Sequence, residues 1–263
     1  MKKYFKVIKM MLLNNLQYMW DLALGSIHFI LIIFIFVNLW QYLYGSGKAM
    51  ISGYDISQMI WYLIVTELII IGTKTALTRG GISDEVKSGN ISYILNKPIN
   101  YIGYQFSNFL GEVIAKLMFY IPFSLVIGFV MIGELRNFNF IHLPFIIIVI
   151  ALGILVDFFF RFVVGLLAFW IEDTSPFFWM YGKFLLVFGV FFPPDLFPKI
   201  VADIVKVSPI AAIVYGPGKM VVDFSFETFW SIIIIQIIYL ILSIALAFFV
   251  YQKGVKKLNV NGG

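Results

Sequence analysis

The residues with the clearest capacity for chemistry are four charged side chains that lie inside long apolar runs. Glu67 and Lys74 fall in one run, and Asp157 and Arg161 fall in another. Charged groups inside a bilayer are costly, so they usually pair with one another, face the interior of a helix bundle, or mark an ion or substrate path. We therefore regard these four residues as candidates for a translocation path or for intramembrane ion pairs.

Sequence spacing distinguishes the two sets of charges. Asp157 and Arg161 are four residues apart, which places both side chains on one face of a helix and favours an ion pair. Glu67 and Lys74 are seven residues apart, so they share a helix face without easily touching, and polar contacts within the bundle are the simpler interpretation. A further four-residue spacing, between Glu112 and Lys116, also permits an ion pair.

The longest polar stretch between two apolar runs is GGISDEVKSGNISYILNKP, residues 80–98. Such a stretch must face water or a soluble partner, because charged groups left in lipid cost several kcal/mol each. Its apolar residues predict short helical pieces, of which Gly89 can end the first. Its charged residues can make charge-assisted hydrogen bonds to a partner surface. The residues that we predict to contact the partner are Ile82, Asp84, Glu85, Val86, Lys87 and Gly89.

Several kinds of site are not expected in this chain. The chain has no cysteine, which excludes disulfides, thiolate metal sites and a cysteine nucleophile. The two histidines, His28 and His142, are far apart, so no metal site is predicted. The sequence contains neither an H-E-x-x-H zinc motif nor a G-x-S-x-G elbow, and it has no Walker A motif G-x-x-x-x-G-K-[ST]. We therefore predict no enzyme activity and no cofactor in this chain.

The composition indicates an all-α integral membrane protein. Of the 263 residues, 61% are hydrophobic and 13% are charged, whereas soluble domains carry about 25% charged residues. The mean hydropathy is +0.95. The net charge is +5, with lysines placed at the ends of apolar segments, which favours membrane lipid over nucleic acid as a partner.

The order of apolar and amphipathic segments predicts one membrane domain over residues 1–263. Lysines and apolar residues at helical spacing in residues 1–21 predict an amphipathic helix at the membrane surface. The polar and apolar pieces of residues 193–227 are each too short to cross a core of ~30 Å, so we predict short re-entrant helices there. The six predicted transmembrane helices cover residues 22–44, 59–77, 105–131, 143–170, 177–192 and 230–250.

The distribution of basic residues predicts the orientation. Six spans leave both ends of the chain on one side, together with residues 80–98. The loops and ends on that side carry Lys2, Lys3, Lys6, Lys9, Arg79, Lys87, Lys97, Lys253, Lys256 and Lys257. The loops on the other side carry Lys48, Arg136, Lys199, Lys206 and Lys219. Because basic residues are in excess on the cytoplasmic side, both termini are expected in the cytosol of a multi-pass plasma-membrane protein.

This arrangement resembles the permease subunits of type-2 ABC exporters, the ABC-2 family. The resemblance rests on the amphipathic start, the six spans, and the proline-rich PPDLFPKIVADIVKVSPIAAIVYGP between the last two spans. It also rests on the polar loop, which reads E-x-x-x-G from Glu85 to Gly89 and L-x-K-P from Leu95 to Pro98. It covers nearly the whole chain.

The resemblance implies a transport subunit that works with other chains. Two permease subunits, identical or related, would pair, and each would dock on a cytosolic ABC ATPase that binds ATP and Mg. Residues 82–91 would contain the coupling helix, and the proline-rich segment would form re-entrant helices near the outer surface. The alternative is an ion- or proton-coupled secondary transporter that uses Glu67, Asp157 and Arg161. Against it, the sequence shows no internal repeat.

Overall fold

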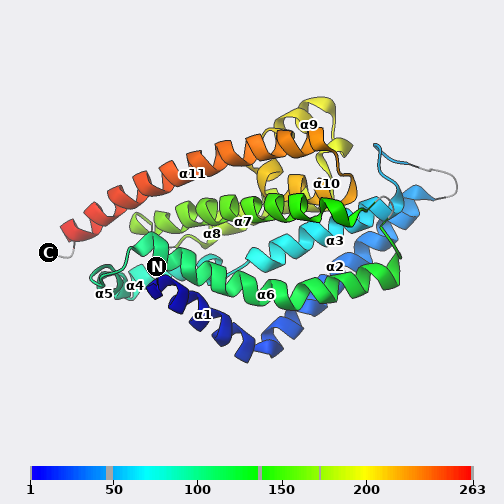
Figure 1. Cartoon of the computed structure of the whole chain (residues 1–263). Helices are drawn as coiled ribbons and strands as arrows, with labels where there is room; N and C mark the ends of the chain where they lie inside the picture. Colours follow the sequence, from blue (N-terminus) through cyan, green and yellow to red (C-terminus); the bar gives the residue numbers. More distant parts are fainter. Residues whose placement is uncertain (1, 46–49, 136–137, 172, 262–263) are drawn as a thin grey trace.

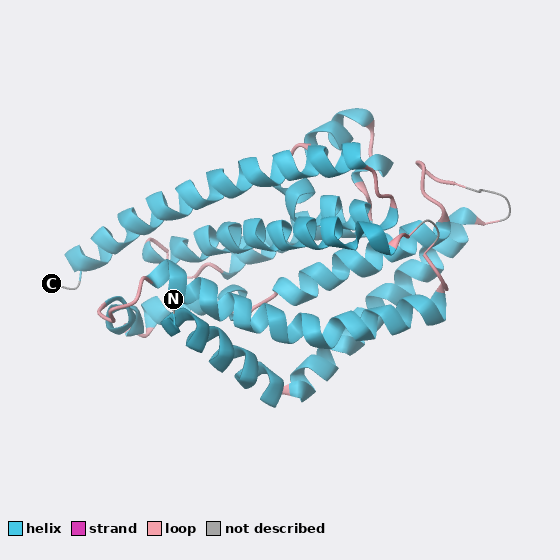
Figure 2. Ribbon diagram, viewed as in Figure 1, coloured by secondary structure: helices cyan, strands magenta, loops and turns pink. Residues whose placement is uncertain are grey.

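The computed structural model describes residues 2–45, 50–135, 138–171 and 173–261, and its elements are helical (Figures 1 and 2). Lys48 and Arg136, which entered the orientation argument, lie outside these residues. Five of the described helices are long and apolar enough to cross a membrane. They are α2 (Met19–Tyr44), α3 (Ile56–Thr73), α6 (Tyr101–Met131), α7 (Leu143–Leu166) and α11 (Phe226–Asn261).

The predicted fifth span is shorter than the others. The helix α8 (Ser175–Leu185) continues through a π-helical turn, η4 (Leu186–Phe191). Together these 17 residues extend about 25 Å, somewhat less than the ~30 Å thickness of a bilayer core. Pro193 and Pro194 follow after Phe192 and cannot continue the helix, which explains the early end.

The segment between α8 and α11 is folded into short pieces. They are the 3₁₀ turn η5 (Pro194–Leu196), α9 (Lys199–Lys206), the π-helical η6 (Ala211–Tyr215) and α10 (Gly216–Val222). The axis bends by 74° between α9 and the η6–α10 helix, the shape of a re-entrant loop or of a broken span. Pro209 stands at the break, where the ring excludes a continuous helix.

Both described ends of the chain lie at the same end of the bundle (Figure 1). The short helices α4 (Gly81–Lys87) and α5 (Asn90–Leu95) lie there too. The α2–α3 connection and α9 lie at the opposite end. The bent pair of α9 and η6–α10 would count as a sixth span if it crossed the membrane, and the passage of α8 and η4 across the membrane stays a prediction.

The N-terminal amphipathic helix is shorter than predicted. It forms α1 (Lys2–Gln17) and breaks at Tyr18, whose ψ of 45° is not helical, so α2 begins at Met19. Glycines on α6 allow α1 to approach closely. A Cβ added at Gly111 would lie 2.6 Å from the carbonyl oxygen of Ile8. Small residues serve this purpose in membrane proteins, where packing rather than the hydrophobic effect holds helices together.

The orientation can be tested with single cysteines, because the chain has none of its own. We expect Ser88→Cys, in the α4–α5 connection, to react with a membrane-impermeant maleimide only after cells are opened. Met50→Cys, in the α2–α3 connection, should react in intact cells. Both positions are exposed. Labelling of Ser88→Cys in intact cells would contradict the cytosolic assignment.

Candidate functional site

The polar loop predicted to contact a partner forms two short helices bounded by glycines. Gly80 and Gly89 precede α4 and α5 with φ angles of +106° and +71°, a left-handed conformation that residues with a Cβ rarely adopt. A Cβ at Gly80 would also lie 2.3 Å from Oδ2 of Asp84. The loop therefore has a defined shape, with a sharp turn on each side of α4.

The residues predicted for partner contact do not all face outward. Asp84, Lys87 and Gly89 are exposed, and Val86 is half-buried. Ile82 is 1% exposed and packs against Gly165 at the end of α7. Ile82, which was predicted to contact a partner, is therefore buried against α7 and does not offer its side chain to a partner in this fold.

Glu85 also points inward, toward α6. Its carboxylate accepts a hydrogen bond of 2.5 Å from the hydroxyl of Tyr101 and bonds of 2.9 and 3.0 Å from Nε2 of Gln105. Burial raises the pKa of the Glu85 carboxyl above its ordinary value, and these hydrogen bonds oppose the rise in part. Glu85 is half-buried and attaches α4 to the start of α6, and its contact with a partner stays a prediction.

A second carboxylate fixes the segment that leads from α3 into α4. Oε1 of Glu112 lies 3.0 Å from Arg79 and 3.0 Å from Lys116, and Oε2 accepts the backbone N–H of Ala76 at 2.8 Å. The Glu112–Lys116 pair was predicted from its spacing, whereas the contact with Arg79 was not. Lys116 also donates to the backbone carbonyl of Lys74. This cluster holds the α3–α4 connection against α6.

Lys74 lies outside the helix in which it was predicted. The predicted span covered residues 59–77, but α3 ends at Thr73, and Lys74 is the exposed residue that caps it. Its side chain therefore lies at the end of α3, at the start of the connection to α4.

Asp157 and Arg161 form the ion pair that their spacing permits. Nε of Arg161 lies 2.7 Å from Oδ2 of Asp157, and both side chains are buried. The hydroxyl of Tyr181 on α8 donates to Oδ1 of Asp157 at 2.6 Å, and Arg161 lies over the Tyr181 ring at 5.3 Å. Arg161 also donates to Oγ1 of Thr73 at 3.4 Å. The pair joins α7 to α3 and α8.

Glu67 lies within the bundle on α3 and is 3% exposed. Among the described residues, its Oε2 atom has no hydrogen-bond partner. The pair with Lys74, left open by their spacing, is not formed in the described structure.

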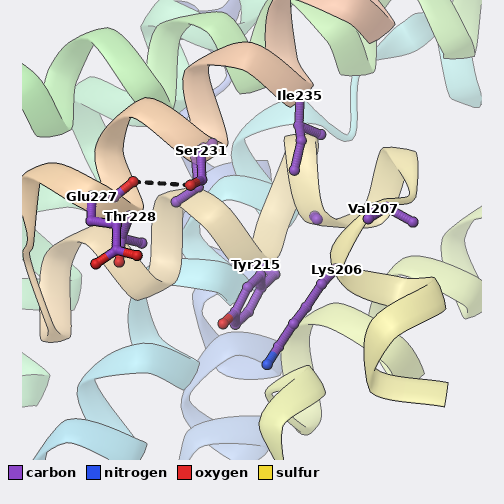
Figure 3. A pocket seen from close by; sticks show the side chains of 9 residues that line it. Lys206, Val207, Tyr215, Glu227, Thr228, Ser231 and Ile235 are labelled. Carbon is purple, nitrogen blue, oxygen red and sulfur yellow. Dashed lines mark hydrogen bonds between the residues drawn. The ribbon is translucent and has the colours of Figure 1, made fainter. Parts of the chain in front are cut away.

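At the opposite end of the bundle, Asp195 connects three segments. Its carboxylate accepts hydrogen bonds from the hydroxyls of Tyr54 at 2.6 Å and Tyr215 at 3.1 Å, and pairs with Lys206 at 2.6 Å. Beside it, Lys206 and Tyr215 line a cavity of about 300 Å³ between α9 and the start of α11 (Figure 3). No local sequence pattern predicts this network, because its members are up to 161 residues apart.

A family model described as ABC-2 family transporter protein matches residues 27–262. The match begins within α2 and extends past the end of α11, so it covers α3 to α11 with the α4–α5 region and the re-entrant segment, and it leaves out α1. No curated protein matches the chain at a significant level. The chain belongs to the ABC-2 transporter family and is a permease subunit of an ABC transporter.

Proposed function

We propose that this chain is the transmembrane subunit of an ATP-driven exporter. It forms the substrate path with a second permease subunit, identical or related, and it docks on a cytosolic ABC ATPase that binds ATP and Mg. The observation that supports this most directly is the α4–α5 region. One side of it is attached to α6 by Glu85, and the other side is exposed at the end of the bundle where both chain ends lie.

The exposed side of α4 and α5 has the chemistry of a docking surface. Asp84 and Lys87 offer opposite charges on neighbouring turns, and Tyr93 on α5 is 65% exposed. Lys97 lies over the Tyr93 ring at 4.3 Å, so the ring has a fixed cationic neighbour. Tyrosine is enriched where partners make their strongest contacts, and the charged groups beside it can form charge-assisted hydrogen bonds to a partner.

The contacts that attach α4 and the segment before it to α6 are suited to passing movement from a docked ATPase to the membrane helices. Glu85 connects α4 to α6, and Glu112 connects the preceding segment to the same helix. A displacement imposed on α4 is then passed to α6 rather than absorbed in a flexible loop. Coupling of this type converts closure of a partner ATPase into rigid-body movement of the membrane helices.

The proposal is tested by purifying the tagged full-length chain from its native membrane in mild detergent. We expect a protein with ABC-ATPase motifs to copurify, and ATP hydrolysis by the complex to need both chains. Purification of the chain with no ATPase, together with transport driven by an ion gradient alone, would contradict the proposal. It would favour the secondary transporter instead.

A further inference from the structure

The helix formed by α8 and η4 carries one charged residue, Lys183, at its middle. Lys183 is exposed and is the ninth of 17 residues, so about 12 Å of helix separates it from either end. Among the described residues, no carboxylate lies within ion-pair distance of it. Its Nζ lies 5.5 Å from the centre of the Trp179 ring.

The residues around Lys183 form one exposed face of the helix. Trp179 is 65% exposed, Met180 50%, Phe184 53% and Val187 41%. The opposite face is buried, with Leu185 at 1% exposure and Tyr181 bonded to Asp157 on α7. The exposed face is therefore an apolar strip with a single cation at its centre.

Neither lipid nor close packing against a second copy suits this face. A cation held in the middle of a lipid-facing helix is costly, and such residues usually face a bundle interior or a water-filled cavity. In a symmetric pair that packed through this face, each Lys183 would approach the other, because an isologous interface brings identical patches together. Two like charges at close range repel each other, unless an anion or water lies between them.

We propose that this face lines the transport path and that the cargo is an amphipathic anion. Its negative group would bind the Lys183 ammonium, and its apolar part would lie on Trp179, Phe184 and Val187. This inference rests on the proposed exporter function and adds the chemical class of the substrate. The anion is either a membrane lipid with an anionic headgroup or a free amphiphile with the same chemistry.

The test uses a cysteine reporter one turn from Lys183 in the full chain, reconstituted in phosphatidylcholine vesicles. Val187→Cys should react with N-ethylmaleimide, because a thiol in water forms the reactive thiolate. Ile241→Cys on α11, which is 61% exposed, serves as the lipid-facing control and should react at least about tenfold more slowly, since a thiol in lipid stays protonated. Equal, slow reaction at both positions would overturn the placement of the face on a watery path.

The preference of the proposed cargo site for an anion is measured by how far added amphiphiles protect Val187→Cys from maleimide labelling. Dodecyl phosphate should slow labelling of Val187→Cys, and dodecyltrimethylammonium should not. Lys183→Met should abolish the protection, and Lys183→Arg should retain it.

Protection by phosphatidylglycerol placed in the vesicles would identify a lipid source, and protection by added dodecyl phosphate alone would identify a free amphiphile. Protection by neither anion, or equal protection by the cation, would overturn the proposal. The assay needs no ATPase, so it remains readable if the exporter proposal fails.

Discussion

The Asp157→Ala variant should be recovered in clearly lower folded yield than the parent and should unfold at a lower temperature in detergent. Asp157 is fully buried and accepts from both Arg161 and Tyr181. Removing it leaves a buried guanidinium and a buried hydroxyl without their partner. Removing one partner of a buried pair typically costs about 3–5 kcal/mol in soluble proteins. We expect a loss of stability near the lower end of this range, because polar contacts between membrane helices are weaker than the buried pairs of soluble proteins.

A double-mutant cycle measures the interaction energy between Asp157 and Arg161 apart from their contacts with other residues. Arg161→Ala added to Asp157→Ala should recover part of the lost stability, with a coupling energy of about 1 kcal/mol. Asp203→Ala, an exposed aspartate on α9, is the matched control and should change stability by less than about 0.5 kcal/mol. Strictly additive losses would show that the contact does not stabilise the fold. Normal folding of both single variants with lost transport would instead place the pair on a substrate path.

Helices and local ion pairs were predictable because their signals lie within a few residues. Apolar runs bounded by breakers located α2, α3, α6, α7 and α11, and the four-residue spacings gave both ion pairs on α6 and α7. The helix ends were less predictable. The end of α3 at Thr73 has local signals in Gly72 and Lys74, which the predicted boundary at residue 77 passed over, and the break at Tyr18 lies where a basic amphipathic stretch gives way to an apolar one.

The orientation of α4 could not be predicted from residues 80–98 alone. Whether Glu85 faces a partner or the chain itself depends on Tyr101 and Gln105, which are 16 and 20 residues further along. Their four-residue spacing at the start of α6 was a usable signal, because it places two hydrogen-bond donors on one helix face. The Asp195 network has no such signal, since its partners meet only through the tertiary fold.

Replacing the two exposed charges of α4 should release the ATPase without disturbing the membrane helices. In Asp84→Ala/Lys87→Ala the net charge is unchanged, and neither residue is buried. Losing desolvated charged contacts at an interface costs roughly 2–5 kcal/mol, which corresponds to about 30-fold or more in ATPase affinity. The measurement is the amount of copurified ATPase per permease, together with the detergent unfolding temperature, which should stay at the parental value.

Two further variants show whether the ATPase is retained by direct contact with the exposed charges of α4 or by the position of α4 against α6. Lys199→Ala/Asp203→Ala makes the same change in charge on the exposed side of α9, at the opposite end of the bundle, and should keep the full amount of ATPase. Glu85→Ala removes the attachment of α4 to α6, so it should lower both the retained ATPase and the transport-linked hydrolysis by whatever ATPase remains bound. Full transport and full ATPase recovery in Asp84→Ala/Lys87→Ala would exclude these residues from the docking surface. Normal coupling in Glu85→Ala would show that α4 transmits movement by a route other than its hydrogen bonds to α6.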